Sequence, residues 1–182
     1  VFAPAPTQGT PILNSTRGTN LTSENLTVYN ITTADSDGDP VYNIYNWYRN
    51  GTSLLVLNMP FENNTINASN STRDYSPYQN NGTVDFGARF NKTGGYDGNG
   101  TYIFDGDDDA INVTDAASLN PAAGITLEVW VNTNHTTNVT FINKPGQYEL
   151  QAGSTITVPD AVPALEVSNG GDRQIVFADT TQ

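Results

Sequence analysis

The stretch from Thr101 to Thr114 reads TYIFDGDDDAINVT, and it decides the fold class. Two short runs of β-branched and aromatic residues, 101–105 and 110–114, flank a turn made of glycine and aspartate. Short runs of this kind, bounded by turn residues, are typical of β-strands. Neither run has the 3.6-residue apolar period of a helix. The stretch therefore predicts a strand, a turn and a second strand.

The same pattern recurs along the chain. We predict further strands at residues 25–33, 41–49, 53–58, 125–132, 139–143, 148–152, 154–158, 164–167 and 174–178. Asn50-Gly51 predicts a type I′ hairpin turn between two of them. Val, Ile, Thr, Tyr, Phe and Trp make up 65 of the 182 residues, and these are the residues that favour strands. The predicted fold class is all-β.

Charge and composition exclude several functions. Seven Lys and Arg against 19 Asp and Glu give a net charge of −12, which leaves nothing to neutralise the phosphates of a nucleic acid. No cysteine is present, so disulfides and thiolate metal sites are excluded. The single histidine, His135, excludes a multi-histidine metal site. The longest apolar run is only Leu54 to Leu57, so we expect no membrane span.

Asparagine occurs 23 times, and 14 of these residues have Ser or Thr two places later, where about four would by chance. None has proline in between, so each matches the acceptor pattern for N-glycosylation. These residues are Asn14, Asn20, Asn25, Asn30, Asn50, Asn63, Asn67, Asn70, Asn81, Asn91, Asn99, Asn112, Asn134 and Asn138. The excess predicts covalent N-glycans. The alternative is that Asn and Thr are simply common in a turn-rich surface protein.

Dense glycosylation predicts an extracellular or cell-surface location. An acidic, threonine-rich chain without cysteine is typical of an archaeal surface protein. Residues 1–6 lack the basic and apolar pattern of a signal peptide, and we interpret Val1 as a mature end left after processing. Truncation of a longer chain is the alternative.

Two segments resemble known families. Asp35 to Val41, followed by Trp47 to Gly51, resembles the third strand of immunoglobulin-like domains in prokaryotic surface proteins, with Trp47 as the core residue of a β-sandwich. The second resemblance is to a laminin-G-like, concanavalin-type jelly roll. The segments that carry this resemblance are residues 57–62, 74–76, 80–84, 94–96, 104–111 and 125–131.

The resemblances imply three parts: an extended N-terminal arm at 1–19, immunoglobulin-like strands at 20–58 and a jelly roll at 59–182. Both sandwiches lack strands that their families have, and an incomplete sandwich is open to a strand from another chain. The predicted donor is the arm, inserted into a neighbouring copy of the same chain. Its predicted contact residues are Val1, Phe2, Ala3, Ala5, Ile12 and Leu13. The alternative is that the arm folds back on its own chain.

Two acidic turns are candidate calcium sites, because Ca²⁺ takes carboxylate oxygens as ligands. Their residues are Asp35, Asp37 and Asp39 in the first turn, and Asp107, Asp108 and Asp109 in the second. A solvated turn is the alternative at both places.

No catalytic pattern is present. Glu128 has no second carboxylate at the spacing that glycoside hydrolases of this fold use, and His135 lies inside an acceptor pattern. We expect no enzyme. The predicted function is a structural subunit of an extracellular, pilus-like filament. The alternative is a carbohydrate-binding adhesin module for cell-surface glycans, although Trp47 and Trp130 lie in strand patterns typical of a core.

Overall fold

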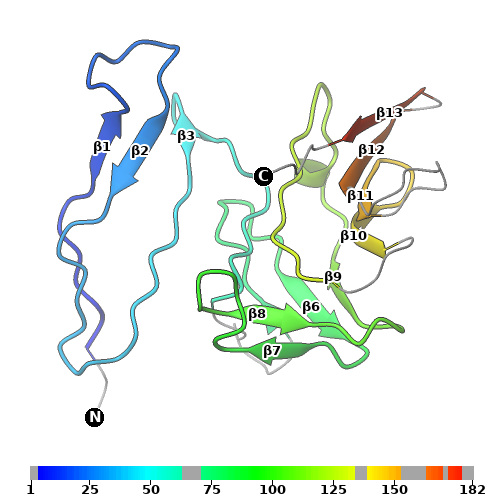
Figure 1. The fold of residues 1–182 in the computed structure, drawn as a ribbon, viewed down its shortest axis with the longest axis horizontal. Coiled ribbons are helices and arrows are strands. Elements are labelled where there is room, and N and C mark those ends of the chain that lie inside the picture. Colours follow the sequence, from blue (N-terminus) through cyan, green and yellow to red (C-terminus); the bar gives the residue numbers. More distant parts are fainter. Residues whose placement is uncertain (1–3, 63–70, 134–138, 153–162, 170–171, 178–182) are drawn as a thin grey trace. The chain divides into compact units, whose positions relative to one another are not determined.

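The computed structural model describes residues 4–62, 71–133, 139–152, 163–169 and 172–177, with the backbone alone from 152 onward. These residues are all-β, with many short antiparallel strands (Figure 1). The one helix among them is a 3₁₀ turn, η1 (Ala117–Leu119). No helix in these ranges has the length and apolar character needed to cross a membrane. The predicted all-β class is confirmed.

The chain divides into two compact units. The first unit, residues 1–94 and 99–112, contains short strands in sheets of two or three. The strands are β1 (Ile12–Ser15), β2 (Leu26–Tyr29), β3 (Tyr48–Arg49), β4 (Thr52–Ser53), β5 (Ser71–Thr72), β6 (Gly82–Asp85), β7 (Arg89–Asn91), β8 (Thr101–Ile103) and β9 (Ala110–Val113). The pairs are β1–β2, β3–β4 and β7–β8, and the three-stranded sheet has the order β5-β6-β9.

The second unit, residues 95–98 and 113–182, contains a four-stranded meander. Its strands are β10 (Val139–Lys144), β11 (Tyr148–Ala152), β12 (Pro163–Asn169) and β13 (Asp172–Phe177). The turn from β10 to β11 has proline at its second position and Gly146 at its third, with φ 74° at the glycine. These are the residues that a type II turn requires.

The predicted hairpin at Asn50-Gly51 is confirmed. Both residues have positive φ, 51° and 81°, as a type I′ turn demands. The flanking strands are much shorter than the predicted 41–49 and 53–58, and that part of the prediction is wrong. Side chains take over the hydrogen bonding there, because Asn58 Nδ2 donates to the Tyr45 carbonyl and Ser53 Oγ donates to Asn46 Oδ1. Such local bonds compete with a strand ladder.

Five strands are predicted after residue 138, and they meet different outcomes. Those at 139–143, 148–152, 164–167 and 174–178 are confirmed as β10 to β13 within a few residues. The one at 154–158 lies outside the described residues.

The predicted strand at 125–132 is wrong, because the structure assigns no strand there. Its alternation nevertheless persists: Ile125, Leu127 and Val129 are half-buried, whereas the residues between them are exposed. The sequence pattern therefore predicted which side of the segment faces the protein, although this segment has no strand partner in the structure.

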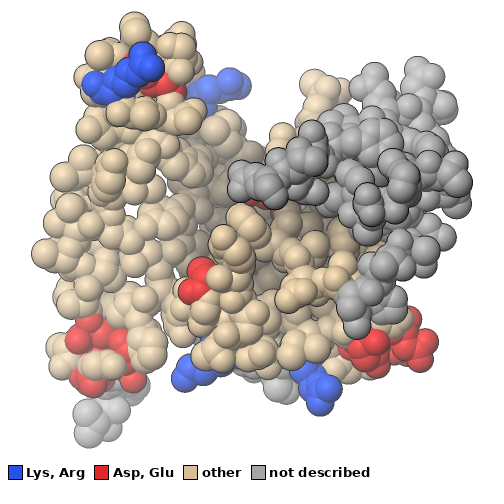
Figure 2. All heavy atoms as spheres, viewed as in Figure 1, with Lys and Arg blue, Asp and Glu red and all other residues tan. Residues whose placement is uncertain are grey.

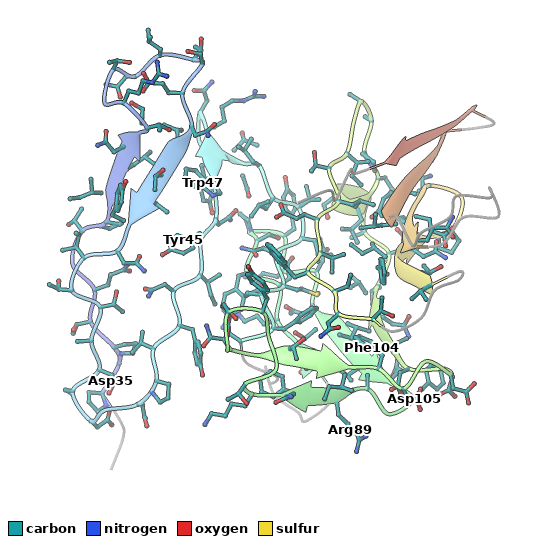
Figure 3. All side chains as sticks on the ribbon, viewed as in Figure 1. Asp35, Tyr45, Trp47, Arg89, Phe104 and Asp105 are labelled. Atoms are coloured by element: carbon teal, nitrogen blue, oxygen red, sulfur yellow. The ribbon has the colours of Figure 1, made fainter. Side chains whose placement is uncertain are left out.

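The described residues bury few side chains. The buried hydrophobic residues are Val84, Tyr102 and Leu119, and the buried polar residues are Ser15, Thr72, Asp74 and Ser76. Trp47, expected as a core residue, is only half-buried on the extended segment before β3 (Figure 3). Tyr102 has the most aromatic contacts, with Phe61 edge-on at 5.3 Å and Phe90 tilted at 5.7 Å.

Candidate functional site

The pair β1–β2, here called the β1–β2 ribbon, is the candidate assembly surface. Leu13 lies opposite Val28 and Ser15 opposite Leu26, and on the other face Ile12 lies opposite Tyr29. Side chains alternate between the faces of a strand, so both faces of this ribbon carry apolar side chains. Ile12, Leu13, Leu26 and Tyr29 are 52%, 58%, 56% and 53% exposed. A sheet with two apolar faces is typical of a buried position.

Residues 12–15 of the predicted arm form β1 and pair with β2 of the same chain, which is the alternative that the sequence analysis left open. Thr7 also forms an isolated bridge with Ala34, and the Gly9 amide donates to the Ile31 carbonyl. The arm therefore folds back along its own chain, because the alternating residues of β2 offer a complementary ladder. Of the six predicted contact residues, Ile12 and Leu13 lie on β1 and Ala5 is exposed. Val1, Phe2 and Ala3 lie outside the described residues.

The loop that joins β1 to β2 is held by side chains. The Asn20 amide donates to Ser15 Oγ at 3.0 Å, and Asn20 takes a positive φ of 58°. The Glu24 carboxylate accepts from the Thr19 hydroxyl and from the Arg17 amide. Hydrogen bonds from the Ser15 and Thr19 hydroxyls lower the pKa of Glu24. The loop is thus a defined structure that must open for β1 to leave its own chain.

The candidate glycosylation residues divide by exposure. Asn14, Asn20, Asn25, Asn50, Asn81 and Asn112 are exposed, and Asn30, Asn91 and Asn99 are half-buried. Asn63, Asn67, Asn70, Asn134 and Asn138 lie outside the described residues. A glycan is bulky and has to project from the surface. The six exposed residues are therefore the ones whose surroundings suit the modification.

One of the two acidic turns brings three carboxylates together. Oxygens of Asp105, Asp108 and Asp109 lie within 4.8 Å of one another, and of the described residues only these form such a group. The sequence prediction named Asp107 in place of Asp105, which follows β8 (Figure 3). The backbone explains the difference, because the Asp107 amide donates to Asp105 Oδ1 and the Asp105 amide donates to Asp109 Oδ2. Carboxylate oxygens are the ligands that Ca²⁺ prefers. A calcium ion at this turn stays a prediction.

The other acidic turn joins two carboxyl groups rather than three. The Asp37 amide donates to Asp35 Oδ1 at 3.0 Å. A hydrogen bond between the two carboxyl groups raises the pKa of Asp37 and lowers the pKa of Asp35. Asp39 belongs to no group of three ligands in the described part of the chain. Figure 2 shows both acidic turns as patches of red on the surface.

Asp74 organises a buried polar hub that the sequence prediction missed as such. Its carboxylate accepts from the amides of Asn58, Ser76 and Asn80 and from the Ser76 hydroxyl, all at 2.7 to 2.8 Å. The residue is only 1% exposed. The segments 74–76 and 80–84, which are among those that carry the jelly-roll resemblance, contain most of this hub. The signal that could have found it is the repeated Asp, Ser and Asn within a few residues, which is typical of side chains that bind backbone amides.

Trp130 is 72% exposed, so its predicted core position is wrong. It lies on the exposed side of the alternating segment 125–130, and its ring stacks on Tyr96 with centroids 4.5 Å apart and planes 12° apart. Tyr96 is 84% exposed. The parity of Ile125, Leu127 and Val129 placed Trp130 on the opposite side, and that signal was available in the sequence.

A comparison with known proteins identified no relative: no family model, curated protein or solved structure matches the chain. The resemblances to immunoglobulin-like and laminin-G-like domains therefore stay predictions. The same holds for the extracellular location and for the absence of an enzymatic activity.

Proposed function

We propose that the chain is a heavily N-glycosylated structural subunit of an extracellular, pilus-like filament, whose copies join by exchanging a β-strand. The immunoglobulin-like and jelly-roll sandwiches that the sequence predicts would be completed in this filament by strands from a neighbouring copy. Support comes from the small number of buried apolar side chains among the residues that the structure describes, and from the sheets of two or three strands in the first unit.

The observation that carries the proposal is the β1–β2 ribbon. Apolar side chains project from both of its faces, and four of them are more than half exposed. An isolated two-stranded ribbon is marginally stable in water. Complete burial of a fully exposed aliphatic side chain is worth about 1.5–3 kcal/mol, and because Ile12, Leu13 and Leu26 are still 52%, 58% and 56% exposed, roughly half of that value remains to be gained by each. Asn14 lies on the same face as Ile12 and Tyr29, whereas the face that carries Leu13, Val28 and Leu26 has no acceptor asparagine. Protein surface that covers this second face therefore provides a driving force for association.

The exchanged strand in this proposal is β1. When β1 leaves its own chain, β2 becomes free to accept β1 of the next copy in the same register. Donor and acceptor are different surfaces of one subunit, so the contact is heterologous and propagates rather than closing on itself. Because each exchanged pairing replaces an identical one, the equilibrium is decided by the apolar burial gained between copies and by the opening of the loop at residues 16–25.

Cysteine substitution can test this exchange, because the natural chain contains no cysteine. Leu13 and Val28 are register partners, so a Leu13→Cys copy and a Val28→Cys copy should form a mixed disulfide only when β1 of one copy lies on β2 of the other. The two variants are mixed, oxidised mildly and analysed by mass spectrometry. A matched control mixes Leu13→Cys with Thr52→Cys, since Thr52 belongs to β4 and pairs with Arg49.

A mixed disulfide in the first mixture and none in the control is the expected result. The double variant Leu13→Cys, Val28→Cys, oxidised as a monomer, locks β1 to its own chain and should abolish filaments in electron micrographs. Filaments that persist with locked β1 would overturn the role of β1 in assembly. Monodisperse monomers from the natural, glycosylated chain would overturn the filament itself.

A further inference from the structure

The Tyr96–Trp130 pair is another exposed aromatic feature of the described residues, and strand exchange does not account for it. Both residues belong to the second unit. Large aromatic rings usually lose exposure when a fold forms, yet these two keep 84% and 72% of theirs. Exposed apolar surface that the fold does not use is typical of a binding site.

The geometry of the pair makes it a flat, preorganised platform. Offset stacking at 4.5 Å with nearly parallel planes is a favourable arrangement of aromatic rings. Each ring covers one face of the other, so each keeps one outer face open to solvent. Because the rings already hold each other, a ligand would lose little of its binding energy to ordering them.

We propose that this platform binds the pyranose ring of a neutral sugar, carried by glycans on a neighbouring copy or on another surface molecule. The face of an aromatic ring carries partial negative charge, and the axial C–H groups of a pyranose carry partial positive charge, so the two stack. The side chains of Thr126 and Glu128 lie on the same exposed side of the segment as Trp130. They offer a hydroxyl group and a carboxylate as partners for sugar hydroxyl groups.

Two further observations select a neutral sugar as the occupant. The net charge of −12 disfavours an anionic ligand such as a phosphate or an acidic peptide. The chain also carries 14 acceptor patterns for N-glycans, so sugar would be present at high local concentration wherever copies of this subunit lie side by side. Such multiple contacts make weak single sites effective.

The experiment uses Trp130 as its own reporter. The chain has two tryptophans, so Trp47→Phe leaves Trp130 as the single indole fluorophore. Cellobiose and N,N′-diacetylchitobiose are titrated into the Trp47→Phe chain, and binding is confirmed by calorimetry. We expect a saturable change in emission, a loss of affinity of at least tenfold in Tyr96→Ala, and no calorimetric signal in Trp130→Ala. Phe86→Ala is the matched control, because it removes a single ring that is 69% exposed and that forms none of the ring pairs found among the described residues.

No saturable response up to the solubility limit of either sugar would overturn the proposal, and so would equal affinities in the Tyr96→Ala and Phe86→Ala variants. Binding of a lysine-rich peptide in place of sugar would replace it with a cation site. Circular dichroism checks that each variant folds.

Sedimentation of glycosylated and unglycosylated protein identifies the source of the sugar. Association that needs the glycans, and that free disaccharide reverses, assigns the ligand to a neighbouring copy. Sugar binding without such association assigns it to other surface glycans. Neither readout depends on strand exchange, so this proposal and the filament proposal can fail separately.

Discussion

The β1–β2 ribbon and the hub around Asp74 belong to the same unit, yet they are stabilised in different ways. The ribbon has a regular backbone ladder of four residue pairs, but its apolar side chains remain about half exposed. The hub has little regular secondary structure, but its central carboxylate is buried and accepts four hydrogen bonds.

The difference shows how a chain with few apolar residues can form an ordered structure. A carboxylate that is fully hydrogen-bonded to backbone amides fixes several loop segments without needing a large apolar core. A strand pair fixes only its own register, and its side chains still need another surface to cover them. The hub is therefore complete within one copy, whereas the ribbon is the part that benefits from a partner.

Removal of the carboxylate should have the largest effect. Asp74→Ala leaves four donors without their acceptor, and unpaired buried groups at a charged site cost about 3 kcal/mol or more in total. Denaturant unfolding followed by tryptophan fluorescence measures this loss. Asp107→Ala is the matched control, because Asp107 is exposed, and it should change the free energy of unfolding by less than about 0.5 kcal/mol. Similar effects of the two substitutions would contradict the role of the hub.

A second variant tests the close approach between Gly100 and the backbone of Phe61. At Gly100, a Cβ atom would overlap the Phe61 carbonyl oxygen, which belongs to the backbone and has little freedom to move. Gly100→Ala should therefore destabilise the fold by about 2 kcal/mol. At Gly124 nothing lies within 4 Å of the added atom, so Gly124→Ala should be neutral or slightly stabilising. Thermal unfolding of both variants measures the difference, and a stable Gly100→Ala would show that this approach is not tight.

Leu26 on the ribbon and Val84 in β6 sharpen the comparison directly. Leu26 is 56% exposed and Val84 only 8%. In dilute monomer, Leu26→Ser should change the free energy of unfolding by less than about 0.5 kcal/mol, whereas Val84→Ala should cost roughly 2 kcal/mol. In concentrated protein, Leu26→Ser should have the larger effect, because it should suppress association and Val84→Ala should not. Light scattering measures this association. A Leu26→Ser chain that associates normally would show that the ribbon is not the contact surface.

The sequence predicted local turns and strands better than it predicted which segments pair with one another. Asn50-Gly51 and the strands of the C-terminal meander were predictable, because turn chemistry and apolar alternation are local properties. The extent of the strand at 41–49 and the strand at 125–132 were not, because a strand needs a ladder partner that its own residues do not specify. Trp130 was assigned to the core by residue type, while the parity of its neighbours pointed outward. Asp74 was noticed only as part of a resemblance, since its burial depends on loops distant in sequence, including Asn58.

The smallest expected effect concerns the loop that must open for exchange. The pKa of Glu24 lies below its ordinary value of 4.5 because of hydrogen bonds from the Ser15 and Thr19 hydroxyls. Because the pKa is lowered, the ionised carboxylate stabilises the closed loop at every pH above the ordinary pKa. This stabilisation is lost as the pH falls through the lowered pKa. Ser15→Ala should raise the pKa of Glu24 toward 4.5, as an NMR titration of its carboxyl carbon would measure. Thr16→Ala is the control, since its hydroxyl donates to the Asn25 carbonyl instead. An unchanged pKa in Ser15→Ala would remove this carboxylate from the set of contacts that hold β1 in its own chain.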